Sequence, residues 1–289
     1  MFSYFARFQI LDRFIGIEAI RAYDPIYTLA PGRAVGTLGL ASNFLGAYML
    51  IPAALILGFG TIASRRRDIA AWSALYVLVF WALALTYTRA SLIAIVVGAV
   101  GYFLWTRRTR MLPAFALALV SVILFTPFLS RFSLGNDRAR LTSQAIEVIR
   151  EHPVSGVGAG EYTPAETSRP TQENQPDGPD RSITPHNSFL LYASELGIPG
   201  GLLALLAVAL PFLGALGRSP RGPFDSPAIL AVAIAAGLGS FALQTLSNNL
   251  LHIPVVTVQF WIAATVGVLV SLHADGPLAR RMSFPIRLR

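Results

Sequence analysis

Three arginines lie where an otherwise apolar chain could hold an anion. Arg89 follows a Thr-Tyr-Thr stretch and opens a long apolar run, whereas Arg138 and Arg140 open a helical pattern in a polar region. A guanidinium group stays charged and binds phosphate through two parallel hydrogen bonds. These positions therefore favour a phosphate or diphosphate ligand. The alternatives are an Arg89 that snorkels to a membrane interface, and a solvated helix face for Arg138 and Arg140.

His186, Asn187 and Glu195 form a second group with possible chemistry. His186 precedes Asn187 at an expected helix start, where the helix dipole disfavours imidazolium. A neutral imidazole there suits a general base, and the alternative is a histidine that only caps the helix. Glu195 lies within an apolar run, and a carboxylate inside a membrane is a functional candidate by default. It could equally pair with an arginine.

Other common kinds of site do not fit the residues. The chain has no cysteine, which excludes thiolate metal sites and disulfides. His152, His252 and His273 have no carboxylate at metal-ligand spacing, so we interpret them as structural. The glycines of residues 156–160 match neither dinucleotide nor Walker loops and predict a turn. We therefore expect no metal and no cofactor.

The composition predicts a membrane protein. Of 289 residues, 54% are hydrophobic and 13% are charged, against about 25% charged in soluble domains. This balance excludes a disordered chain or one that coats nucleic acid. All 23 basic residues are arginine, and the net charge of +8 indicates topology and not nucleic-acid binding.

The apolar runs predict an all-α fold, a polytopic bundle of about seven transmembrane helices. A span needs roughly 20 apolar residues, and continuous runs argue against a barrel. The third run is short and the first and fifth are long, so we expect tilts or breaks. The predicted spans are residues 35–62, 69–87, 90–106, 111–129, 189–216, 228–250 and 253–272.

Arginine clusters predict the orientation. They follow the first, third, fifth and seventh spans, which places all four on one side, the cytoplasmic side. The expected organisation is an external or interfacial segment (1–34), spans (35–129), a long external loop (130–188), spans (189–272) and a cytoplasmic basic tail (273–289). Residues 2–23 have the pattern of an interfacial helix without a signal peptide. Either later spans translocate this segment, or spans that once preceded it are missing, and we favour the second alternative.

The external loop changes character along its length. Asn136 and Asp137 are candidate N-caps of an amphipathic helix that runs to Glu151 and stops at Pro153. Residues 163–181 are polar and rich in proline, and they predict a flexible flap. A new helix then begins near His186 and runs into the fifth span.

Three blocks of this chain, taken in order, resemble the O-antigen ligase family of bacterial polysaccharide assembly. Residues 86–91 (Thr-Tyr-Thr-Arg-Ala-Ser) are similar to its Thr-x-Ser-Arg-Gly block. Residues 138–158 are similar to "Arg … His-Pro-Leu-x-Gly-Val-Gly", with Thr142 where relatives often carry Trp. Residues 186–200 are similar to "His-Asn-Ser … Glu-Leu-Gly-x-Pro-Gly", and residues 33–48 match more weakly. Family members commonly have ten or more spans.

The resemblance implies a lipid-dependent membrane glycosyltransferase with a GT-C-like fold. Such an enzyme moves a glycan from undecaprenyl diphosphate to a hydroxyl of lipid A core or another glycan, on the periplasmic face of the bacterial inner membrane. Transfer is expected to be inverting and metal-independent. Arg89, Arg138 and His186 match the family's functional arginines and histidine. Arg140, Asn187 and Glu195 are weaker candidates for substrate contacts.

Several alternatives remain open at the level of the sequence. A polymerase or a protein O-glycosylating relative would differ from a ligase only in its acceptor. A transporter of lipid-linked glycans belongs to another class, and it would bind the diphosphate without chemistry. The expected partners are a lipid-linked glycan donor, a glycan or lipid acceptor and membrane lipids, with no nucleic acid and no metal.

Overall fold

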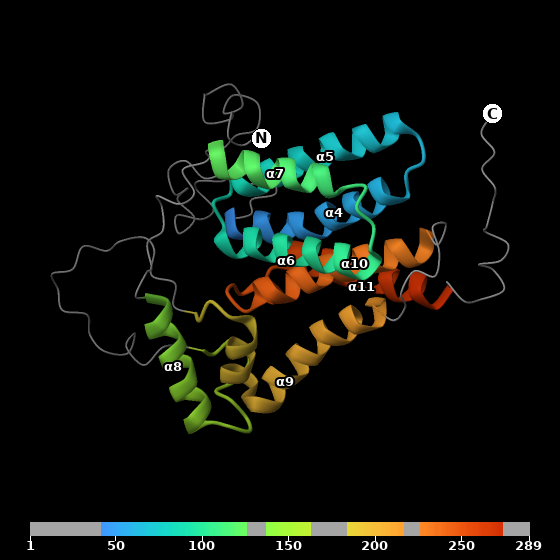
Figure 1. Cartoon of the computed structure of the whole chain (residues 1–289). Coiled ribbons are helices and arrows are strands. Elements are labelled where there is room, and N and C mark those ends of the chain that lie inside the picture. The colour runs from blue at the N-terminus through green and yellow to red at the C-terminus, as the bar shows by residue number, and fades with distance from the viewer. Residues whose placement is uncertain (1–41, 126–136, 163–183, 217–225, 274–289) are drawn as a thin grey trace, which may run out of the picture.

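The computed structural model describes residues 42–125, 137–162, 184–216 and 226–273, and these residues form helices without strands. The predicted all-α fold is confirmed. The elements, shown in Figure 1, are α4 (Ser42–Ile62), α5 (Arg66–Ala84), α6 (Arg89–Thr106), α7 (Leu112–Phe125), α8 (Asp137–Glu151), α9 (Ser188–Leu216), α10 (Ser226–Thr245), the 3-10 helix η4 (Leu250–His252) and α11 (Pro254–His273).

Six of the described helices are long and apolar enough to cross a membrane, namely α4, α5, α6, α9, α10 and α11. The fourth predicted span corresponds to α7, whose described part is shorter at 14 residues. Residues 35–41 of the first predicted span and 126–129 of the fourth lie outside the described residues, as do the expected interfacial helix and the polar flap. The chain is a polytopic helical membrane protein.

Two helix boundaries differ from the prediction for physical reasons. The second span was expected to reach residue 87, but α5 ends at Ala84 and Tyr87 adopts a left-handed conformation with φ 50°. The sixth span was expected to reach residue 250, but α10 ends at Thr245. A turn and η4 follow it. The Ser247 hydroxyl donates back to the Gln244 carbonyl, whereas Asn248 and Asn249 form hydrogen bonds with Ser188 and Thr184 near the start of α9.

The fifth predicted span contains the break that its length suggested. Gly197 has φ 74° and ψ 179°, which no helix contains. The break divides α9 into a short first part, residues 188–196, and a long second part, residues 198–216. In Figure 1 the second part runs obliquely, away from the bundle at the break and close to α11 at its C-terminal end, and α8 lies beside the first part.

Small residues let the three central helices approach one another closely. A Cβ atom added to Gly46 of α4 would lie 2.5 Å from the Ser91 Oγ of α6, and one added to Gly98 of α6 would overlap Ser240 of α10. Apolar residues fill the space around these contacts, with Leu50 and Ile95 essentially inaccessible. Close contact between helices through small residues is the usual way in which spans associate in lipid.

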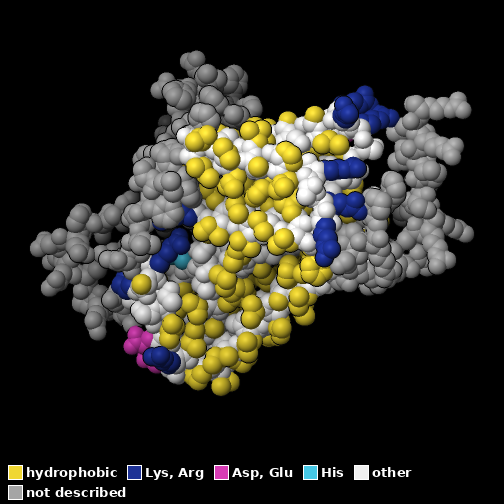
Figure 2. Space-filling view, viewed as in Figure 1, with side chains coloured by type: hydrophobic (Ala, Val, Ile, Leu, Met, Phe, Trp, Pro, Cys, Tyr) yellow, Lys and Arg dark blue, Asp and Glu magenta, His cyan; other side chains and the backbone are white. Residues whose placement is uncertain are grey.

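Arginines mark both ends of this bundle. Dark blue basic side chains gather at two opposite ends in Figure 2, and an apolar band separates them. At one end, the Arg110 guanidinium donates a hydrogen bond of 3.0 Å to the Ala63 carbonyl, which joins the start of α7 to the end of α4. This is the end that the arginine rule assigns to the cytoplasm.

We predict the topology with single cysteines in this cysteine-free chain. Thr109 and Ala159 are both exposed, at the arginine-rich end and in the loop after α8. With the predicted orientation, a membrane-impermeant maleimide added to intact cells labels Ala159→Cys at once. Thr109→Cys reacts only after permeabilisation. Labelling of Thr109→Cys in intact cells would contradict the orientation.

Candidate functional site

A buried polar network fixes the start of α6, which carries Arg89. The Thr88 hydroxyl donates to Asn43 Oδ1 at 3.2 Å, and the Ser91 hydroxyl donates to Gln244 Oε1 at 2.9 Å. Gln244 Nε2 then donates to the backbone carbonyl of Asn43 at 3.1 Å. Because a buried amide must find partners within the protein, this network joins α4, α6 and α10 in one register. It lies at the bundle end opposite the Arg110 contact.

The chain turn before Arg89 is strained. Tyr87 has φ 50°, and a left-handed residue with a side chain costs about 1–2 kcal/mol. The Thr86 hydroxyl donates to the Leu83 carbonyl at 2.7 Å and accepts from the Thr88 amide at 3.3 Å. These hydrogen bonds hold the turn that brings the half-buried Arg89 to the first position of α6.

His186 is placed by the start of α9. The Asn187 side-chain oxygen Oδ1 accepts hydrogen bonds from the amides of Phe189 and Leu190 at 2.9 and 3.1 Å, so Asn187 is the N-cap of this helix. The Ser188 hydroxyl, fully buried, donates to the Asn248 carbonyl at 3.1 Å. Since Asn248 follows the end of α10, His186 lies at the same end of the bundle as the start of α6.

The α8 helix runs in the same direction as the first part of α9. Ala145 packs in a small cluster with Leu191 and Tyr162, and Ser194 donates to the Ala145 carbonyl at 3.4 Å. Further along both chains, the Ile198 amide donates to the Pro153 carbonyl at 2.8 Å. Because the two segments are parallel, α8 begins near the end at which α9 begins.

This direction decides where Arg138 lies. Arg138 is exposed on the first turn of α8, about 10 Å from Ala145 at the helical rise of 1.5 Å per residue. It therefore lies toward the bundle end that holds Arg89 and His186. Figure 2 shows basic side chains, in dark blue, and a small exposed area of histidine, in cyan, at this end of the molecule. Arg140 is also exposed on α8 and interacts with other parts of the chain.

The glycine-rich stretch after α8 pairs with the break in α9. The Ser194 carbonyl accepts from the Val157 amide at 3.0 Å, and the Glu195 carbonyl accepts from the Gly158 amide at 2.9 Å. In a continuous helix the Glu195 carbonyl would face Pro199, which has no N–H to donate. The predicted turn is confirmed, and its amides replace the helix bonds that α9 lacks.

Two glycines make this pairing possible. Gly156 has φ 64°, and a Cβ atom there would lie 2.3 Å from the Glu195 carbonyl oxygen. Gly197 has φ 74°, and its Cβ atom would lie 2.2 Å from the Val154 carbonyl oxygen. The two backbones therefore touch directly. The glycines of the two sequence blocks allow this contact.

Glu195 is a buried carboxylate at this junction. It is 6% exposed, and no ion pair in the described part of the chain involves it. The Tyr162 hydroxyl is buried and has no hydrogen-bond partner in the described part of the chain, and burial raises the pKa of Tyr162.

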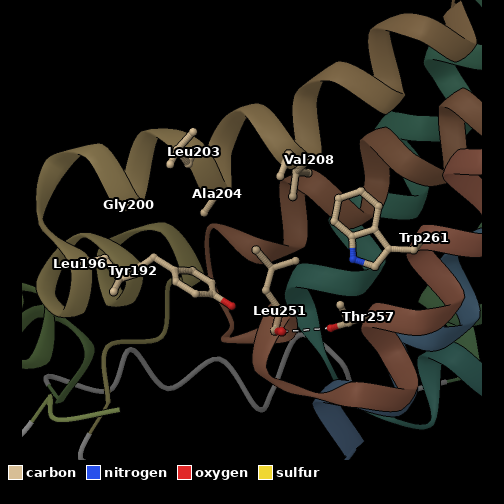
Figure 3. Close-up of a pocket in the computed structure, with 10 residues that line it drawn as sticks. Tyr192, Leu196, Gly200, Leu203, Ala204, Val208, Leu251, Thr257 and Trp261 are labelled. Atoms are coloured by element: carbon tan, nitrogen blue, oxygen red, sulfur yellow. Dashed lines mark hydrogen bonds between the residues drawn. The ribbon is translucent and has the colours of Figure 1, made fainter. Parts of the chain in front are cut away.

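An apolar groove of about 300 Å³ lies between the second part of α9, which runs obliquely, and α11. Figure 3 shows Tyr192, Ala204, Val208 and Leu251 around it, with Trp261 at the α11 side. The ring of the exposed His252 stacks on Tyr192 at 4.8 Å. The interpretation of His252 as structural agrees with this stacking.

The remaining histidines have backbone roles or lie at the edge of the described chain. The exposed His152 ends α8, and its carbonyl accepts from the Gly156 amide at 3.1 Å. The His273 side chain lies outside the described residues. Within the described ranges, no group of three or more His, Asp or Glu residues could hold a metal ion.

Sequence reasoning missed the groups that hold the site. Asn43, Gln244 and the asparagines after α10 were not singled out as partners of the α6 and α9 starts. Their signal is a polar amide at the end of an apolar run, where lipid offers no hydrogen bonds. Arg89, Arg138 and His186 lie at the same end of the bundle, and each belongs to the start of a different helix.

The fold thus defines a helical membrane protein with a polar site at one end of its bundle. Residues 74–205 match the O-antigen ligase family model, which confirms the resemblance of the sequence blocks. The matched part includes α6, α8, the α9 break and all the proposed site residues. No curated protein matches the chain.

We predict that the glycine contact is a large part of the stability of this end. An alanine at φ above zero costs about 1–2 kcal/mol, and Gly156→Ala and Gly197→Ala add a backbone overlap to that cost. Gly160→Ala is the matched control, because φ there is 77° but nothing lies within 4 Å. Thermal unfolding in detergent should give clearly lower midpoints for the first two variants. Equal midpoints for all three would show that the close contact is unimportant.

Proposed function

We propose that this protein transfers a glycan from undecaprenyl diphosphate to an acceptor hydroxyl, on the periplasmic face of the bacterial inner membrane. The observation that carries the proposal is the gathering of the starts of α6, α8 and α9 at one bundle end, within a chain that matches the O-antigen ligase family. Each start carries one of the three matched residues, Arg89, Arg138 and His186.

The leaving group determines what the arginines do. When the acceptor oxygen attacks the anomeric carbon, the bond between that carbon and the diphosphate oxygen breaks, and negative charge develops on the lipid diphosphate. Arg89 and Arg138 would stabilise this charge through bidentate hydrogen bonds. The N-terminal ends of α6 and α8 add to the attraction, because a helix N-terminus carries partial positive charge. Arg140 would add a weaker contact.

The proton of the acceptor hydroxyl needs a base. His186 directly precedes the Asn187 N-cap, where the dipole of α9 favours neutral imidazole. It would take the proton as the new glycosidic bond forms. Direct displacement of this kind inverts the configuration at the anomeric carbon. Asn187 and Glu195 are the remaining proposed substrate contacts of this segment.

The groove between α9 and α11 supports a lipid-linked donor. Its lining is mainly apolar, and Tyr192 lies near its end closest to the α9 start. Such a groove offers an isoprenoid chain a place beside the bundle while the diphosphate stays at the polar end. The identity of the acceptor distinguishes a ligase from a polymerase and from a protein-glycosylating enzyme, and no described residue favours one of these three.

We predict large rate losses for the charged residues. Replacing Arg89 or Arg138 by Ala should lower transfer by on the order of 10²–10³, as for one transition-state donor. Lys should restore only part, because it loses the planar fork. His186→Ala should remove most transfer but keep donor binding, since a base acts mainly in the transition state. The measurement is single-turnover transfer from a lipid-linked donor, together with donor binding.

The matched control for Arg138→Ala is Arg150→Ala. Both arginines are exposed on α8, but Arg150 is in the last turn, far from the α9 start. Arg150→Ala should transfer at the wild-type rate. The assigned roles would be wrong if His186→Ala lost donor binding while the arginine variants turned over normally. Full transfer in all three site variants would place the site elsewhere.

We also predict that transfer is metal-independent. The sequence holds no pair of acidic residues spaced to bind a divalent ion over a diphosphate, so the arginines must neutralise it. Excess EDTA should leave the rate of the purified protein unchanged. A rate that disappears with EDTA and returns with Mg²⁺ would overturn this assignment of the diphosphate site.

A further inference from the structure

The segment that carries His186 is fastened on both sides to the hairpin between α10 and α11. Before His186, the Thr184 hydroxyl accepts a hydrogen bond of 2.9 Å from Asn249 Nδ2. After it, the Ser188 hydroxyl donates to the Asn248 carbonyl and accepts from the Leu251 amide at 3.4 Å. The His186 imidazole is thus carried on a short stretch of backbone that hydrogen bonds hold at both ends. We call the bond to Asn249 the Thr184 tether and the bonds to Asn248 and Leu251 the Ser188 tether.

The two tethers differ in chemistry. The Ser188 tether involves backbone groups of the hairpin, and it is fully buried where α9 packs. The Thr184 tether joins two side chains and has no helix to support it. Between Thr184 and His186 lies Pro185, buried and with a fixed φ, so a shift of Thr184 would pass directly to His186.

The Asn249 side chain uses only the donor of its carboxamide in this contact. It occupies the N-cap position of η4 but makes no capping hydrogen bond. Its Oδ1 atom is buried and has no hydrogen-bond partner among the described residues, which costs about 1–3 kcal/mol for a buried acceptor. A residue placed there for stability alone would satisfy that oxygen. The Asn249 Nδ2 group instead donates to Thr184, in the segment that carries His186.

We propose that Asn249 is a positioning residue for His186 and acts through Thr184. This inference rests on the proposed function, in which His186 is the general base. A base must lie within hydrogen-bond reach of the acceptor hydroxyl, and a displacement of about 1 Å can cost 10²-fold in rate. Asn249 itself does not touch the substrate, so its loss affects the chemical step and not donor binding.

The test combines substitutions at both ends of the hydrogen bond in the full-length protein. Asn249→Leu keeps the approximate volume without a donor, and Thr184→Val removes the acceptor with little change of shape. Each should lower kcat by about 10- to 100-fold, with KM for the lipid-linked donor within about twofold of wild type. The double variant should be no slower than either single variant, because both remove one interaction.

Two further variants separate positioning from general damage. Thr184→Ser keeps the hydroxyl and should restore most of kcat. Thr245→Val removes a buried hydroxyl that bonds only within α10, to the Ala242 carbonyl at 2.6 Å, and it should leave kcat unchanged. Thermal unfolding and size-exclusion chromatography of each variant measure the folded fraction.

The outcomes are distinct. Wild-type kcat in Asn249→Leu, losses that multiply in the double variant, a raised KM with normal kcat, or losses that follow the folded fraction would each overturn the positioning role. If the wild-type protein forms no product with any lipid-linked donor, the proposed function fails and this inference fails with it. If wild type forms product and the variants match it, only the positioning role is wrong.

Discussion

The break in α9 is the constraint on which the outer half of this structure depends. Backbone carbonyls that are buried at a helix break need donors, because an unpaired buried carbonyl costs free energy. Pro199 removes the donor that the Glu195 carbonyl needs, and the Ile198 amide turns to Pro153 instead of Ser194. The loop after α8 then supplies two amides and one carbonyl at this point. The break and the loop therefore require each other.

This mutual requirement positions more than the loop. Once residues 153–158 are bound at the break, α8 must end there, and its contacts through Ala145 align it with the first part of α9. Arg138 is carried toward the start of α9 as a result. At the break α9 stands away from α11, and its second part then returns to α11, which leaves the apolar groove of Figure 3 between the two helices. One backbone interruption thus accounts for the placement of α8 and for the groove.

Much of this architecture could be predicted from the sequence, because apolar runs and arginine clusters report directly on the bilayer. The helix from Asp137 to Glu151 was predicted with its bounds, since its caps and its periodicity agree. The pairing of Gly156 with Gly197 was not predictable. Both glycines are visible as turn residues, but only the fold shows that Gly156 makes room for the Glu195 backbone and Gly197 for the Val154 backbone.

The same limit applies to the candidate site. Arg89 and His186 could be selected because charged and titratable residues are rare in apolar chains. Asn43, Gln244 and Asn249 could not be assigned partners, because an amide at the end of a span is compatible with solvent, lipid headgroups or another helix. Their hydrogen bonds join segments up to 201 positions apart. Long-range pairing of this kind leaves no local pattern.

The placement of the cationic groups runs against helix electrostatics and is the strongest physical reason to consider an anionic ligand. Arg89 and Arg138 lie in the first turns of α6 and α8, where the partial positive charge of the helix end disfavours a cation by some 0.3–1 kcal/mol. Helix stability would favour carboxylates at these positions. An anion reverses the balance, because it is attracted by the guanidinium groups and by the helix ends together. The diphosphate of the proposed donor would supply such an anion.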